Sequence, residues 1–143
     1  MNIDSLGSTT FRREDIDRGF EPDSCFYIQN AARVRGKKRI DLSSDPPPDL
    51  VIEIDITSPS LDKFPIFAQA GVPEVWRFDG GQLTIYELAA GEYLERDASI
   101  AFPTVAAADI TTFIKESETM NRPEWVRKLR GWALDHNITK LDP

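Results

Sequence analysis

Residues 47–80 read PPDLVIEIDITSPSLDKFPIFAQAGVPEVWRFDG, and this stretch decides the fold class. Its first part, residues 50–56, is an aliphatic and largely β-branched run interrupted only by Glu53 and Asp55. A run of this kind after a proline-rich loop is typical of a buried central strand. Because side chains alternate between the two faces of a strand, Glu53 and Asp55 share one face and the isoleucines share the other. Two carboxylates are therefore predicted to project together from a core strand.

The second part of the same stretch, residues 57–71, predicts a short helix. Pro65 comes early enough to be tolerated in the first turn, and Gly71 is placed to end the helix. Phe67 belongs to a set of apolar residues at helical spacing that should face the sheet. Lys63 is then left to point elsewhere, just beyond the end of the strand that carries the carboxylates.

Further strands are predicted on both sides of this unit. Upstream, an apolar run at residues 25–28 predicts a strand, whereas residues 33–49 are rich in charge, serine and proline and predict a loop. Downstream, short apolar runs separated by glycine turns predict a β-meander, made of VWRF (75–78), LTIYEL (83–88) and YLERD (93–97).

From Asp109 onward the apolar residues recur at helical spacing, so the end of the chain is predicted to be helical. Together these patterns predict an α/β (α+β) fold. We expect a central mixed, mostly antiparallel sheet flanked by helices in one domain, residues 1–143, with a helical tail over residues 110–143 packed on it.

Composition restricts the kind of site that this chain can build. Its 143 residues are 41% hydrophobic and 29% charged, which is typical of a globular domain. Cys25 is the single cysteine and His136 the single histidine, so a bound metal must be held largely by carboxylates. No apolar run approaches the roughly 20 residues that span a bilayer, and the N-terminus lacks a signal-peptide pattern. We expect a cytoplasmic protein without a membrane partner.

The net charge of −7 argues against a uniformly basic nucleic-acid-binding surface. Two local basic runs stand against this trend, at residues 33–39 and 122–130. Each is either a solvated face or a contact for a polyanion.

Asp23, Glu53, Asp55 and Lys63 form the set of side chains that a magnesium-dependent phosphodiesterase uses. Hard divalent cations prefer carboxylate oxygens, and at a phosphate they can activate water and stabilise negative charge. A carboxylate inside an aliphatic strand is costly unless it is paired or coordinated. Glu53 therefore forms a salt bridge with Lys63 or an arginine, lies at a solvated face, or binds a metal.

The stretch 47–80 resembles the core signature of the bacterial Uma-two family of restriction endonucleases, which belongs to the PD-(D/E)XK nuclease-like superfamily. FEPDSCFYI, residues 20–28, is similar to the upstream Pro-Asp strand of that family. The resemblance covers residues 8–100. It implies a restriction-endonuclease-like fold, DNA as the substrate, and Mg²⁺ or Mn²⁺ as the cofactor.

Mapped residue by residue, the resemblance places the first catalytic acid of the superfamily at Asp23 and the second at Glu53. Asp55 stands where the superfamily pattern has its lysine, and Lys63 on the following helix takes the place of that lysine. The implied roles are metal binding by Asp23 and Glu53, assistance by Asp55 as an auxiliary ligand, and stabilisation of phosphate charge by Lys63.

Members of the family usually carry an extra helix and hairpin before the region where this chain begins. We therefore expect that the chain is N-terminally short and that it forms a homodimer. The alternative to an endonuclease is a catalytically inactive module that keeps the nuclease fold for binding or assembly. A third alternative is a protein that acts on DNA only together with partners.

Overall fold

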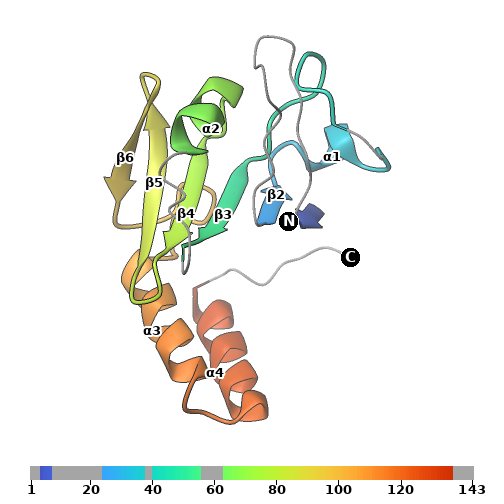
Figure 1. The fold of residues 1–143 in the computed structure, drawn as a ribbon. Helices are drawn as coiled ribbons and strands as arrows, with labels where there is room; N and C mark the ends of the chain where they lie inside the picture. The colour runs from blue at the N-terminus through green and yellow to red at the C-terminus, as the bar shows by residue number, and fades with distance from the viewer. Residues whose placement is uncertain (1–3, 8–23, 38–39, 56–62, 137–143) are drawn as a thin grey trace.

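The computed structural model describes the backbone of residues 4–7 and, with side chains, residues 24–37, 40–55 and 63–136. Six strands lie within this part of the chain: β1 (Asp4–Gly7), β2 (Ser24–Tyr27), β3 (Leu50–Ile54), β4 (Glu74–Phe78), β5 (Leu83–Ala89) and β6 (Glu92–Arg96). The helices are α1 (Ala31–Val34), α2 (Phe64–Ala70), α3 (Ala107–Ser117) and α4 (Arg122–Asp135) (Figure 1).

The strands form a single sheet in the order β1-β2-β3-β4-β5-β6. Strands β3 and β4 are parallel, in a register that runs from Leu50↔Glu74 to Ile54↔Phe78, and every other neighbouring pair is antiparallel. A parallel pair needs a crossover connection, and α2 lies in it. The expected mixed, mostly antiparallel sheet flanked by helices is confirmed, with β3 as one of its two central strands.

Helix α2 has the start and end that the sequence predicts. Pro65 lies in its first turn, and Gly71 caps its C-terminus in the left-handed conformation with φ of 83°. Only glycine adopts that backbone conformation at little cost, so the helix ends there. Phe67 is fully buried in the core, together with Val51 of β3 and Val75 of β4.

The two faces of β3 differ in burial in a way that matters for the site. Val51 and Glu53 are buried on the face that belongs to the α2 core, whereas Ile54 on the opposite face is 52% exposed. The pleat thus places the carboxylates, and not the isoleucines, on the more buried face.

Two helices, α3 and α4, follow the sheet, and residues 137–143 of the predicted tail lie outside the described residues. Helix α3 packs on β5, where Thr111 Oγ1 accepts a hydrogen bond of 3.0 Å from the backbone N–H of Leu83. Helix α4 packs on α3 through two tryptophans. Trp125 Nε1 donates a hydrogen bond of 2.8 Å to the carbonyl of Phe113, and the ring of Trp132 lies edge to face with that of Phe113, with 5.1 Å between the ring centroids. Figure 1 shows both helices at the end of the sheet toward which β3 and β4 run. Within the described residues, no helix combines the length and apolar character needed to cross a membrane.

The loop predicted at residues 33–49 is interrupted at its start by helix α1, which the sequence analysis did not predict. Ala31 and Val34 are buried on one side of this single turn and belong to the core cluster. Four residues are too few for a periodicity that could be recognised in the sequence. The tertiary contact stabilises the turn.

Candidate active site

Glu53 is the buried carboxylate around which the site is built. It is the fourth of the five residues of β3, between Ile52 and Ile54, and its side chain is 1% exposed. Strands β2 and β4 flank β3, so backbone hydrogen bonds on both sides hold β3, and with it Glu53, in place. A carboxylate at this depth needs partners that offset its lost hydration.

Lys63 provides one such partner. It occupies the N-cap position of α2, and its Nζ lies 3.5 Å from Glu53 Oε2, across ten residues of sequence. The lysine side chain is 43% exposed, while the glutamate side chain is 1% exposed. The ammonium group therefore lies between the buried carboxylate and solvent. The structure thus brings together Glu53 and Lys63, the two residues that the family resemblance pairs. They form the salt bridge that the sequence analysis gave as one of the alternatives for Glu53.

Asp55 is held by an arginine that the sequence analysis missed. Arg77 Nε donates to Asp55 Oδ2 at 2.6 Å, with the two side chains 20% and 4% exposed respectively. The hydrogen bond from Arg77 to Asp55 raises the pKa of the guanidinium above its ordinary value. Arg77 belongs to β4 and is the register partner of Glu53, so both pairs lie on one face of the sheet. The sequence signal that could have identified Arg77 is its position as a charged residue inside the apolar run VWRF, residues 75–78.

Asp23 lies outside the described residues, so its predicted role is not tested. The neighbouring positions are described: Ser24, which follows Asp23, is the register partner of Ile52, which precedes Glu53. Strand β2 is also fixed to the start of β3, because buried Asp49 accepts hydrogen bonds from the backbone N–H of Ile28 at 2.7 Å and from Asn30.

The donor set has the chemistry that a hard divalent cation requires. Glu53 and Asp55 offer carboxylate oxygens from a single face of β3. Mg²⁺ is commonly bound through only one or two carboxylates and keeps several waters. No group of three or more histidine, cysteine, aspartate or glutamate side chains with metal-binding geometry occurs within the described ranges. Of the described residues, Glu53 and Asp55 are the ones that could hold a cation there, and waters would fill its remaining positions.

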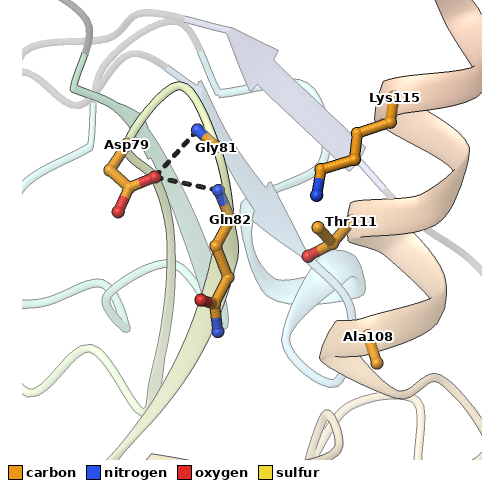
Figure 2. A pocket seen from close by; sticks show the side chains of 6 residues that line it. All are labelled: Asp79, Gly81, Gln82, Ala108, Thr111 and Lys115. Carbon is orange, nitrogen blue, oxygen red and sulfur yellow. Dashed lines mark hydrogen bonds between the residues drawn. The ribbon is translucent and has the colours of Figure 1, made fainter.

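A pocket of about 500 Å³ lies between the β4–β5 turn and α3 (Figure 2). Asp79 fixes the turn by accepting hydrogen bonds of 2.9 Å from the backbone N–H groups of Gln82 and Gly81, which hold its pKa below the usual range. None of Glu53, Asp55, Lys63 and Arg77 lines this pocket. Its lining is Asp79, Gly81, Gln82, Ala108, Thr111 and Lys115. No pattern in the sequence predicts this pocket.

Comparison with known proteins gives one family. The Uma2 family model, described as "Putative restriction endonuclease", matches residues 2–112. A search of curated proteins finds no match. The matched region includes all six described strands, Glu53, Asp55, Lys63 and Arg77, and it ends within α3.

Proposed function

This chain belongs to the Uma2 family, and on that premise we propose that it is a metal-dependent endonuclease that hydrolyses phosphodiester bonds in DNA. The observation that carries the proposal is the position of Glu53, a buried carboxylate in a core strand with a lysine ammonium group 3.5 Å away on its solvent side. A glutamate is rarely this buried unless it is paired, and Glu53 differs from the equally buried Glu74 in that it contacts a partly exposed cation, whereas Glu74 accepts hydrogen bonds from neutral donors.

The metal ligands in this proposal are Asp23, Glu53 and Asp55. When bound, Mg²⁺ or Mn²⁺ would supply Lewis acidity at a phosphoryl oxygen and lower the pKa of a coordinated water. The chain positions of the three acids support their grouping, because Ser24 and Ile52 are register partners and Asp55 shares a face with Glu53.

Lys63 and Arg77 have different tasks in this arrangement. Lys63 is nearly half exposed, so its ammonium group can leave Glu53 and contact a phosphate oxygen, where it would stabilise developing negative charge. Arg77 is mostly buried and holds one oxygen of Asp55 at 2.6 Å. It acts as a positioning residue that fixes the orientation of the Asp55 carboxylate.

A second candidate function is favoured by the same ion pairs. Glu53 contacts Lys63 and Asp55 contacts Arg77, so each carboxylate has a cation from its own chain. Such pairs could serve a nuclease-fold module that binds or assembles without cleaving. This module would bind neither Mg²⁺ nor Mn²⁺ at millimolar concentration.

Cleavage of supercoiled plasmid by the full chain, with Mg²⁺ and then Mn²⁺, tests the proposal. We expect metal-dependent nicking that is lost in Glu53→Gln and reduced at least about 100-fold in Lys63→Ala, the range for loss of one transition-state contact. Glu87→Gln is the matched control, since Glu87 pairs with Arg96 on an exposed part of the sheet. Its nicking should equal that of the unmodified chain.

One result would count against the assigned residues and another against the endonuclease itself. Nicking that survives Glu53→Gln would exclude Glu53 as a ligand. Absence of both nicking and calorimetric Mn²⁺ binding would favour the binding module. Sedimentation of the same sample measures the oligomeric state, for which we propose a homodimer.

A further inference from the structure

We propose that helix α4 carries a contact surface for the phosphate backbone of duplex DNA, formed by Arg122, Arg127 and Arg130. These three residues, here called the arginine face, are all exposed. The inference rests on the proposed function, because it takes DNA as the substrate. It goes beyond the family match, which ends at residue 112 and leaves the whole of α4 outside.

Helix geometry separates two of these arginines from the side of α4 that packs on α3. Trp125 and Trp132 define the packed side through their contacts with Phe113. Arg127 follows Trp125 by two residues, and Arg130 precedes Trp132 by two. At 3.6 residues per turn, two residues correspond to about 200° of rotation, so both arginines lie on the outer side.

The remaining arginine lies at the start of the helix, eight residues before Arg130 and so about 80° from it around the axis, beside the outer side of α4. Arg122 is the first residue of α4, and its side chain is exposed. At a rise of 1.5 Å per residue, Arg122 and Arg130 are about 12 Å apart along the axis. Duplex DNA presents one negative charge per roughly 1.7 Å of its axis, so a surface of this length faces several phosphates.

The ion pairs of α4 distinguish the arginine face from the other cation of the helix. Lys128 Nζ forms an ion pair of 2.7 Å with Glu116 of α3, so its charge is used to join the two helices. Among the described residues, none of the three arginines forms an ion pair with a carboxylate; Arg127 Nε contacts only the Pro123 carbonyl of its own helix, at 3.4 Å. Three guanidinium groups are thus available in a chain whose net charge is −7.

Charge and position together favour DNA as the occupant. A chain with this net charge is repelled by a polyanion overall, so binding requires a local concentration of cations. Arginine suits this role because its planar guanidinium can form two hydrogen bonds with one phosphate. Figure 1 shows α4 at the end of the sheet toward which β3 runs, the strand that carries Glu53.

The test measures binding of the full chain to a fluorescently labelled 20-base-pair duplex by anisotropy, without divalent metal, between 25 and 200 mM NaCl. Each phosphate contact contributes about 0.9 to the slope of log K against log salt. The triple variant Arg122→Gln, Arg127→Gln, Arg130→Gln should lower that slope by about 2.7 and weaken binding by two to three orders of magnitude at about 0.1 M salt. The control Lys128→Gln should leave the slope unchanged.

The outcomes separate this inference from the proposed function. A slope that is equal in the triple variant and the unmodified chain, or no measurable binding by the unmodified chain at 25 mM NaCl, would overturn it, even where Glu53→Gln abolishes plasmid cleavage. A lowered slope supports it even where no cleavage is found. Circular dichroism verifies that the helices remain, and if the triple variant loses helix content, Arg130→Gln alone should lower the slope by about 0.9.

Discussion

Replacing Arg77 with methionine is expected to destabilise the protein and loosen the candidate site at the same time. The guanidinium donates to Asp55 at 2.6 Å, and the Asp55 side chain is only 4% exposed. Methionine keeps much of the apolar stem but removes the charge, so a nearly buried carboxylate loses the cation that offsets its desolvation.

The magnitude follows from the burial of the two partners. Removing one member of a buried ion pair costs about 3–5 kcal/mol, whereas an exposed pair contributes roughly 0–1 kcal/mol. Arg77 is 20% exposed, so some water reaches the pair, and the lower end of the buried range, about 3 kcal/mol, is expected. In the matched control Arg96→Met, the lost pair has side chains that are 45% and 34% exposed, and the cost should stay below about 1 kcal/mol.

Urea denaturation of Arg77→Met, Asp55→Asn and the double variant measures this directly. With a slope of about 1.5 kcal/mol per molar urea, the midpoint of Arg77→Met should fall by about 2 M. The double-mutant cycle should give a coupling energy of about 2 kcal/mol. A coupling below about 0.5 kcal/mol would refute the reasoning, because it would mean that Asp55 does not depend on Arg77.

Two further predictions concern carboxylates outside the site. Hydrogen bonds from Lys37 and then from the backbone N–H of Asp41 hold the pKa of Asp45 below its ordinary value. The ionised Asp45 therefore stabilises the fold above about pH 4, and this stabilisation is lost as the pH falls through the folded pKa. In Asp45→Asn, the melting temperature should change less between pH 4 and 2 than in the unmodified chain. Glu74 is 1% exposed and accepts hydrogen bonds from four neutral donors, so Glu74→Gln should cost about 2–3 kcal/mol in urea denaturation, whereas Glu87→Gln should cost under 1 kcal/mol.

The strand–helix–strand unit could be predicted from the sequence because each of its signals is local. The β-branched run 50–56 is a strand pattern, and Pro65 and Gly71 mark the beginning and end of α2 through their own backbone preferences. The glycine turns of the meander act in the same way. Such signals depend on a few neighbouring residues, so they survive without knowledge of the tertiary structure.

The candidate site could be predicted only in part, because its pairings depend on contacts between distant residues. Alternation along β3 predicts that Glu53 and Asp55 share a face, but the burial of that face depends on where α2 packs. Likewise, Arg77 lies beside Glu53 only because β3 and β4 are parallel and in this register, and a shift of one residue would place the arginine on the opposite face.

Lys63 and Arg77 differ in what was needed to predict their partners: a sequence resemblance for Lys63 and the three-dimensional fold for Arg77. Lys63 reaches Glu53 from the start of the helix that follows the same strand, so a resemblance between sequences was enough to pair them. Arg77 reaches Asp55 from the next strand of the sheet, where only the fold brings them together. The exposed cation is thus available to contact a substrate, while the mostly buried one holds its acid in place. If the site binds a metal, loss of Lys63 should impair turnover more than metal affinity, and loss of Arg77 should impair metal affinity as well.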